Sequence, residues 1–459
     1  MDAATGSAAP PRTGGLRGSA TILIRAWRRY WFAPSAAADL GVARAVFFAC
    51  TFALYVGEDF SGWANVSPAF WMPIWMFRAL HIPLASHVTL RVLQVVWKVA
   101  LLAGAVGIFT RASAALAFVL GFYLLGLPHN FGHTYHFDAV LVFAFAILAC
   151  AHAGDAWALD RLIWPGRTPA EEYAERQATG EYRWPVRLIW LATALVLFAA
   201  GLSKLRHSGL QWVFSDTMAI FLTKAYYHIS DADPLVRWGL TIAAHPWLAR
   251  GMAASALVVE TCFPFALVSS QARRLLLPGA FGMLVAIRVL MGPTFGGFLA
   301  VFAFWTPWEA IGERLAAKLG RSPTRLLIYD GDCGLCGRTV SIVRALDLMM
   351  KVETRDAISD WPDLASRFPA LDQDACLDEM HVISSRGEVF RGFRAYRALA
   401  WALPAGWLAL PFAYLPGVPQ VGDVLYRFVA ARRSRSCALS PASERPAPTS
   451  ERREPASSR

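Results

Sequence analysis

Two cysteines in the last third of the chain have the spacing of a redox pair. Cys333 and Cys336 are separated by two residues, and the other five of the seven cysteines are isolated in the sequence. A short apolar strand is expected over 326–329 and an amphipathic helix over 335–349, so Cys333 is expected at a helix N-terminus. The dipole and free amides of such an end stabilise a thiolate. The pattern therefore predicts Cys333 as the nucleophile and Cys336 as the resolving thiol.

Other chemistries remain open at the same segment. Asp330 and Asp332 are candidate substrate-binding residues, although negative charge beside a thiol raises its pKa. A zinc site needs two more ligands, and Cys376 and Cys437 are single and distant in sequence. A magnesium-dependent phosphatase would need a downstream acidic pair that the sequence does not offer. A fold kept only for binding is a further alternative, because no proline precedes the strand expected at Met380.

A second polar group is the histidine-rich segment 129–136. His129, His133 and His136 are spaced by four and three residues, and Asp138 follows. On one helix face they could bind a metal or move protons, whereas an interfacial polar loop without chemistry is the alternative. A membrane di-metal oxygenase would need several such groups, and the others of the ten histidines are scattered. We expect no metal site.

Lys204 stands at the end of an apolar segment, in the sequence Ala200 to Leu205. A lysine removed from water at that depth has a lowered pKa and can act as a base. Alternatively, its long side chain reaches the membrane interface and anchors the segment there.

The composition is that of a membrane protein with a soluble C-terminal part. Of 459 residues 56% are hydrophobic and 17% charged, with mean hydropathy +0.39. The net charge of +11 comes largely from basic residues beside apolar segments, which favours anionic lipid over nucleic acid as a partner. The cysteine pattern excludes a secreted disulfide framework.

Apolar segments predict a bundle of about eight membrane helices. They lie near 39–57, 92–109, 113–127, 138–153, 185–203, 252–270, 273–291 and 294–308. With eight spans, the arginines and lysines of the connections gather on one side together with both termini, so both termini are expected in the cytoplasm. We see no cleaved signal peptide.

The chain is expected to have five parts. These are a basic arm with an interfacial helix (1–34, with the helix at 22–32), a membrane domain (35–310), a linker (311–324), an α/β domain (325–437) and a disordered tail (438–459). In the α/β domain, strands at 380–384 and 388–391 are expected to form a hairpin, followed by a helix over 393–401. The apolar segment 404–429 contains four prolines and is not expected to span a membrane.

The order of motifs in the membrane domain resembles the horizontally transferred transmembrane domain family, which includes the vitamin K-dependent gamma-glutamyl carboxylase. The motifs are Gly132-His133-Thr134-Tyr135, Trp157-Ala158-Leu159-Asp160, Ala200-Gly201-Leu202-Ser203-Lys204-Leu205 and Trp212. The resemblance implies a reduced vitamin K-type quinone as cofactor, Lys204 as the base toward it, His133 in the active centre and Tyr135 as a substrate-binding residue. We expect a bacterial-type inner-membrane protein. One departure is Ile287-Arg288-Val289, where a histidine-containing segment is expected.

The C-terminal part resembles the DCC family of thiol-disulfide oxidoreductases. The resemblance rests on three segments: Tyr329-Asp330-Gly331-Asp332-Cys333-Gly334-Leu335-Cys336, Arg391-Gly392-Phe393-Arg394-Ala395 and Tyr426-Arg427. It implies a thioredoxin-like fold but not the physiological substrate. We expect no bound cofactor in this domain, and a protein or peptide as its partner. The expected function is therefore a carboxylase-like, quinol-linked membrane domain fused to a cytoplasmic dithiol oxidoreductase. The alternative is a non-enzymatic membrane scaffold that carries a thioredoxin-like binding module.

Overall fold

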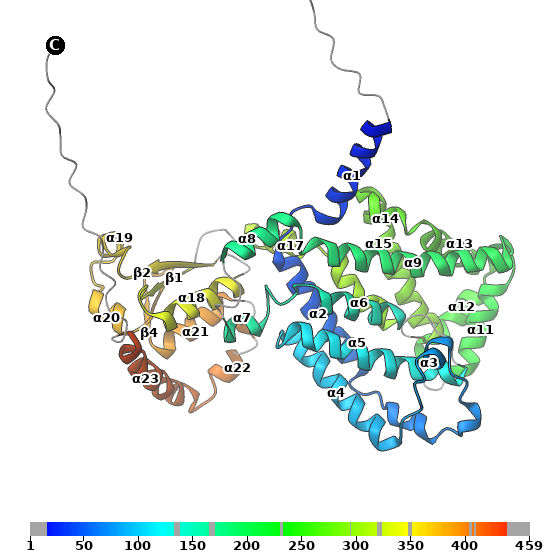
Figure 1. The fold of residues 1–459 in the computed structure, drawn as a ribbon, viewed down its shortest axis with the longest axis horizontal. Coiled ribbons are helices and arrows are strands. Elements are labelled where there is room, and N and C mark those ends of the chain that lie inside the picture. The colour runs from blue at the N-terminus through cyan, green and yellow to red at the C-terminus, as the bar shows by residue number, and fades with distance from the viewer. Residues whose placement is uncertain are drawn as a thin grey trace, which may run out of the picture. The chain divides into compact units, whose positions relative to one another are not determined.

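The computed structural model divides the chain into two compact units, Met1–Ile311 and Gly312–Arg459 (Figure 1). The structure describes residues 16–132, 138–164, 170–229, 233–293, 295–318, 324–347, 351–403, 406–407 and 410–437. The tail expected to be disordered, 438–459, lies outside these residues.

The described part of the first unit is helical. Its longer helices are α1 (Leu16–Phe32), α2 (Ala37–Tyr55), α4 (His87–Val106), α5 (Thr110–Gly126), α6 (Ala139–Cys150), α9 (Arg183–Ser208), α11 (Thr217–Ile229), α13 (Pro246–Cys262) and α15 (Ser270–Met291). Shorter elements connect them: η1 (Phe60–Asn65), η2 (Pro68–Phe70), α3 (Trp75–Ala79), η3 (Leu127–Phe131), α7 (Leu159–Ile163), α8 (Ala170–Thr179), α10 (Gln211–Phe214), η4 (Pro234–Val236), α12 (Arg237–Ala243), α14 (Phe265–Val268), α16 (Gly296–Val301) and η5 (Phe302–Trp305). Helix α17 (Trp308–Lys318) runs across the division between the units.

Several of these helices are long and apolar enough to cross a membrane. Among the described residues there are five, Ala37–Tyr55, His87–Val106, Thr110–Phe131, Ala174–Ser208 and Ser270–Met291. A sixth results if Pro234–Ala243 and Pro246–Cys262, which meet at 106°, form one broken span. The expected segments 138–153 and 294–308 contain shorter apolar helices, Ala139–Cys150 and Gly296–Trp305. The membrane class agrees with the prediction, and the number of about eight spans stays a prediction.

The core of the first unit is built around aromatic residues of α2. The Phe47 ring lies 5.2 Å from that of Phe145 in α6 and 5.4 Å from that of Phe304 in η5, measured between centroids. Helix α4 approaches α2 closely at Gly104, where an added Cβ would lie 2.5 Å from the ring of Phe48. A larger residue at Gly104 would therefore separate the two helices.

The second unit contains a four-stranded sheet flanked by helices. The elements are β1 (Arg325–Tyr329), α18 (Gly334–Leu346), β2 (Val352–Asp356), α19 (Trp361–Arg367), α20 (Gln373–Asp378), β3 (His381–Ser384), β4 (Val389–Arg391), α21 (Phe393–Ala402), α22 (Leu410–Ala413) and α23 (Val418–Cys437). The strand order is β2-β1-β3-β4, with β1 parallel to β2 and antiparallel to β3, and β3 antiparallel to β4. The expected first strand, hairpin and following helix are confirmed, whereas β2 was not predicted.

Alternating side chains of β1 explain why this strand is buried on both faces. Leu327 packs with Val340 of α18 and Leu399 of α21 on one face. Leu326 and Ile328 pack on the other face, in a cluster that includes Leu364 of α19 and Cys376 of α20. Successive side chains of a strand point to opposite faces, so one short strand supports both layers. The loop that follows β1 is thereby held at the edge of a rigid sheet.

Candidate functional site

The two cysteines lie where the sequence placed them, at the junction of β1 and α18. Cys333 is the N-cap residue of α18 with extended backbone angles (φ −90°, ψ 111°). Its carbonyl accepts the N–H of Gly337 at 2.9 Å, and its own N–H donates to the Asp330 carbonyl at 3.3 Å. Cys336 stands in the first turn of the helix. Both cysteines are thus at the N-terminal end of the helix.

Both thiols are nonetheless covered. Cys333 is 1% exposed and Cys336 2% exposed, whereas the residues between them, Gly334 and Leu335, are exposed. In disulfide exchange a thiolate attacks a sulfur of the partner disulfide, so the partner must be able to reach the cysteine sulfur. Exchange at this site therefore requires a local opening of the loop, and we expect slow alkylation of the resting protein.

Asp330 and Asp332 shape the loop that carries the cysteines. The Asp330 carboxylate accepts the N–H of Asp332 at 3.0 Å, which closes a turn two residues long. Asp332 itself is exposed, one residue before Cys333. The geometry gives Asp330 a positioning role, and substrate binding by either carboxylate stays a prediction.

Asp356 at the end of β2 holds the same loop and was missed by the sequence analysis. Its carboxylate accepts the N–H of Gly331 at 3.0 Å, the N–H of Ile358 at 3.0 Å and the hydroxyl of Ser359 at 2.9 Å. Burial would raise the pKa of Asp356, but the hydrogen bonds from Ile358, Ser359 and Gly331 lower it below its usual value. The carboxylate therefore stays charged at neutral pH.

Gly331→Ala is expected to free the dithiol loop from β2. An added Cβ would lie 2.4 Å from the nearer Asp356 oxygen, so the hydrogen bond to that carboxylate must break. Losing a hydrogen bond to a charged group costs about 1–3 kcal/mol. Hydrogen exchange of a peptide covering 329–337 should become faster. Gly334→Ala is the matched control, because no atom lies within 4 Å of its added Cβ; equal effects of the two variants would contradict the role given to Asp356.

His381 in β3 makes the stability of this unit depend on pH. The side chain is fully buried, Nδ1 lies 2.8 Å from the Glu379 carbonyl, and among the described residues Nε2 has no hydrogen-bond partner. Burial is the largest cause that lowers the pKa of His381 from its ordinary value of 6.5. The folded state therefore favours the neutral ring, so stability is complete above pH 6.5 and falls as the pH drops below it.

Hydrogen exchange of the β3 peptide at pH 7.5 and pH 5.5 checks this prediction. We expect the protection of β3, corrected for the intrinsic exchange rate, to fall at the lower pH. His381→Asn keeps an N–H donor near the position of Nδ1 but cannot titrate, so it should lose this pH dependence. The same loss of protection in His381→Asn would show that another group is responsible.

Tyr426 ties a segment far along the chain to the sheet of the second unit. Its hydroxyl accepts the N–H of Met380 at 3.0 Å, which ties α23 to the start of β3. Gly392 lies against its ring with a positive φ of 56°. The motif residues near 392 and 426 therefore support the sheet.

Lys204 does not stand alone in the membrane unit. Its Nζ lies 2.6 and 2.5 Å from the two carboxylate oxygens of Glu260 on α13 and 5.3 Å from the ring centre of Trp212. The side chains of Lys204 and Glu260 are 22% and 9% exposed. Neither sequence interpretation included a carboxylate partner. The available signal was a single acidic residue inside an apolar segment, 252–270.

An apolar cavity of about 870 Å³ ends at Lys204. It runs along α6 and α9 and is lined by Phe143, Ala146, Ile147, Leu188, Leu191, Ala192, Leu195, Val196, Ala199, Ala200, Ser203 and Lys204. Only Ser203 and Lys204 offer polar side chains, both at its end. Such a cavity suits a large apolar ligand with one polar group.

The histidine cluster is largely outside the described residues. His133, Tyr135 and His136 fall in the gap 133–137, so their predicted roles are not tested. In the flanking described residues, Asn130 accepts the N–H of Ile74 at 2.9 Å, and Asp138 accepts the Tyr55 hydroxyl at 2.5 Å. In the part of the chain that the structure covers, no three His, Cys, Asp or Glu side chains gather in a way that could hold a metal ion.

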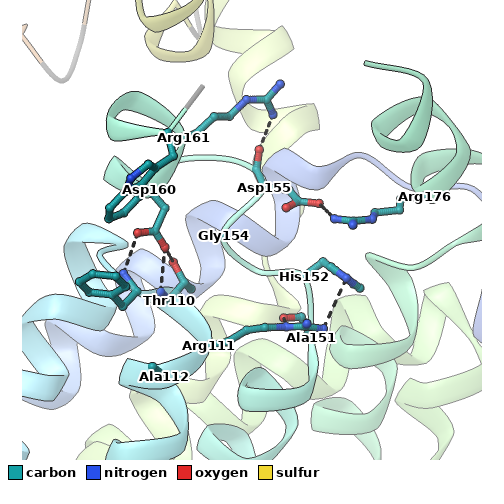
Figure 2. Close-up of a pocket in the computed structure, with 12 residues that line it drawn as sticks. Thr110, Arg111, Ala112, Ala151, His152, Gly154, Asp155, Asp160, Arg161 and Arg176 are labelled. Carbon is teal, nitrogen blue, oxygen red and sulfur yellow. Dashed lines mark hydrogen bonds and ion pairs between the residues drawn. The ribbon is translucent and has the colours of Figure 1, made fainter. Parts of the chain in front are cut away.

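The Trp157-Ala158-Leu159-Asp160 segment borders a cavity of about 360 Å³ (Figure 2). Figure 2 shows the Asp160 carboxylate next to Thr110 at the start of α5. The carboxylate accepts the N–H of Phe109 at 2.7 Å and the N–H and hydroxyl of Thr110 at 2.8 and 2.9 Å. Asp155 likewise accepts Arg176 at 2.6 Å and the Tyr182 hydroxyl at 2.7 Å. Hydrogen bonds therefore satisfy both carboxylates, and Asp160 clamps its segment to the start of α5.

Comparison with known proteins finds a family match within the second unit. Residues 327–438 match the DCC1-like thiol-disulfide oxidoreductase family. An uncharacterized chloroplastic protein of Arabidopsis thaliana is 26% identical over 106 residues, which are 22% of this chain and 46% of that protein. The chain thus spans about half the length of this relative. No solved structure matches the chain. Taken with the position of Cys333 and Cys336, the match shows that the chain carries a DCC1-like thiol-disulfide oxidoreductase domain at residues 327–438.

Proposed function

We propose that the protein is a membrane-anchored oxidoreductase that exchanges disulfides through Cys333 and Cys336. The observation that carries this proposal is the position of the pair on the first turn of α18, directly after β1. The β-α-β order followed by an antiparallel hairpin and a helix supports a thioredoxin-like fold for the domain. The substrate class is a disulfide in a protein or peptide, and the soluble domain needs no bound cofactor.

The exchange proceeds in two steps that conserve electrons. The Cys333 thiolate attacks one sulfur of the substrate disulfide, which forms a mixed disulfide and releases the other substrate sulfur as a thiolate. The Cys336 thiolate then attacks the Cys333 sulfur, and the second substrate sulfur leaves. The substrate gains two electrons, and the protein is left with a Cys333–Cys336 disulfide. Protons lost by the two cysteines are taken up by the released substrate thiolates.

Thiol release from a disulfide-bonded peptide tests this function. The reduced, purified full chain should release two thiols per protein molecule and then stop. Cys376→Ser is the matched control, because Cys376 is buried on the opposite face of the sheet and its thiol pKa is raised by burial. This variant should release as much thiol as the unmodified chain. Release that depends on Cys376 would contradict the proposal.

We propose a second function for the membrane unit, the oxidation of a reduced vitamin K-type quinone. It is supported by the apolar cavity that ends at Lys204. The quinone tail would fill the cavity, and a ring hydroxyl would lie at Lys204. As an ammonium ion paired with Glu260, Lys204 can accept the quinol proton only after its own proton has moved to that carboxylate, 2.5 Å away. Molecular oxygen is the co-reactant, and the role of His133 is part of the same proposal.

Oxygen-dependent conversion of vitamin K hydroquinone to its epoxide tests the second function. The unmodified chain should form epoxide, and Lys204→Ala should form none. Epoxide formation at equal rates in both proteins would remove Lys204 from the chemistry. No epoxide from either would leave the membrane unit as an anchor for the dithiol domain, which is the scaffold alternative.

The apolar helices and the basic arm support a membrane location. We propose a bacterial-type inner membrane with both termini in the cytoplasm, where thiols are kept reduced. Helix α1 supports contact with the bilayer surface, because it combines Arg25, Arg28 and Arg29 with exposed Ile22, Leu23 and Trp27. The partners are therefore the lipid bilayer, the quinone and a protein or peptide substrate, without nucleic acid.

A further inference from the structure

A third cavity in the membrane unit is lined by four arginines. It has a volume of about 540 Å³ and lies where α2, α9 and α15 begin and η5 ends. Arg183 and Arg187 of α9 and Arg273 and Arg274 of α15 line it. This cavity shares no lining residue with the one that ends at Lys204.

The positive charge of this cavity is not balanced by carboxylates. Among the described residues, none of the four arginines forms an ion pair, and three donate to backbone carbonyls instead: Arg183 to Tyr30 at 3.3 Å, Arg187 to Leu267 at 3.4 Å and Arg273 to Ala266 at 3.0 Å. The single acidic residue of the lining, Asp39, accepts the N–H of Glu309 at 2.8 Å.

Aromatic rings hold two of the guanidinium groups in place. Arg187 lies 4.3 Å and Arg273 4.4 Å from the ring centre of Trp190. Trp190 in turn stacks on Trp305 at 4.4 Å and donates its ring N–H to the Phe304 carbonyl at 2.8 Å. The like charges of Arg187 and Arg273 are therefore kept close together before any ligand arrives, so that little ordering remains when an anion binds.

Three helix N-termini add to the positive potential. Asp39 lies in the first turn of α2, Arg183 opens α9 and Ser270 opens α15, and all three line the cavity. Each helix start contributes a partial positive charge that favours an anion. Together with the arginines, they form a site for a group that carries a negative charge and several acceptor oxygens, which describes a phosphate.

The surroundings identify the source of that phosphate as a lipid. Helix α15 is mainly exposed, because only 17% of its most apolar window is buried, and its Leu275 is 73% exposed. In a membrane such a face contacts acyl chains. We propose that this cavity binds the phosphate headgroup of an anionic phospholipid, whose acyl chains lie along α15. A soluble phosphate would use the arginines but leave the apolar face of α15 unexplained.

Lipid retention by the full-length protein tests the proposal. The protein is purified in detergent, mixed with phosphatidylglycerol or phosphatidylcholine, and examined by native mass spectrometry, with inorganic phosphate as a third arm. We expect one phosphatidylglycerol per chain, retained at least about tenfold more tightly than phosphatidylcholine, since one charge-assisted contact is worth about that factor. Inorganic phosphate should not displace it at equal concentration.

Two variants and one control make the result specific. Arg187→Gln should weaken phosphatidylglycerol binding about tenfold. Arg274→Gln tests the same site without disturbing packing, because Arg274 is exposed, and it should weaken binding in the same direction. Arg237→Gln removes an exposed arginine elsewhere in the unit and should have no effect. Equal retention of both lipids, displacement by inorganic phosphate, or equal binding by all three variants would each overturn the proposal.

Discussion

Cys333→Ser is expected to abolish disulfide exchange, with a loss of about a thousandfold or more in the rate of thiol release. Serine fills nearly the same volume at this 1% exposed position, so the fold should be kept. Its hydroxyl cannot attack a disulfide at neutral pH, and Cys336 in the first turn of α18 lacks the N-cap position. The measurement is the initial rate of thiol release from a disulfide peptide by the reduced protein.

Cys336→Ser should behave differently, and this contrast assigns the two roles. The first attack can still occur, so a mixed disulfide between Cys333 and the peptide should accumulate and be visible by intact-protein mass spectrometry. If the peptide were trapped on Cys336 in the Cys333→Ser variant instead, the roles of nucleophile and resolving thiol would be reversed.

Glu260→Ala is expected to destabilise the membrane unit by about 3 kcal/mol. It leaves the Lys204 ammonium group without its carboxylate at a site where the lysine is only 22% exposed. A charge left unpaired in such surroundings costs much more than an ion pair gains. Unfolding of the detergent-solubilised protein should occur at a lower temperature, and the measurement is the loss of helical signal on heating.

The double variant Glu260→Leu with Lys204→Met separates stability from chemistry. Apolar residues of similar volume remove both charges, so most of the stability lost in Glu260→Ala should return. Epoxide formation, if Lys204 is the base, should not return. A double variant as unstable as Glu260→Ala would show that the destabilisation has another cause.

Local signals explain which parts of the dithiol site could be predicted. The apolar strand β1, the turn that follows it and the amphipathic α18 are adjacent in sequence, so the position of Cys333 required only short-range patterns. Strand β2 was missed because Val352–Asp356 lacks the alternation of apolar and polar residues that predicts a strand. All five of its residues are half-buried. Asp356 could not be placed against Gly331 without knowing that β1 and β2 are parallel neighbours.

Long-range pairing explains the missed features of the membrane unit. Lys204 and Glu260 are 56 residues apart, and no periodic pattern connects them. Short and broken helices limit what hydropathy can say about spans, because Ala139–Cys150 has only 12 residues and α13 bends away from α12. The convergence of the four arginines in the third cavity could not be predicted, because it depends on how three helices begin together.

A redox titration of the full-length protein tests the central claim most directly. The protein is equilibrated in mixtures of reduced and oxidised glutathione, its thiols are trapped, and the fraction with a Cys333–Cys336 disulfide is measured by peptide mass spectrometry. The account predicts a reversible two-electron transition with a midpoint between about −300 and −120 mV, the range of dithiol oxidoreductases. Two thiols that stay reduced across all mixtures, or that each form only separate glutathione adducts, would contradict it.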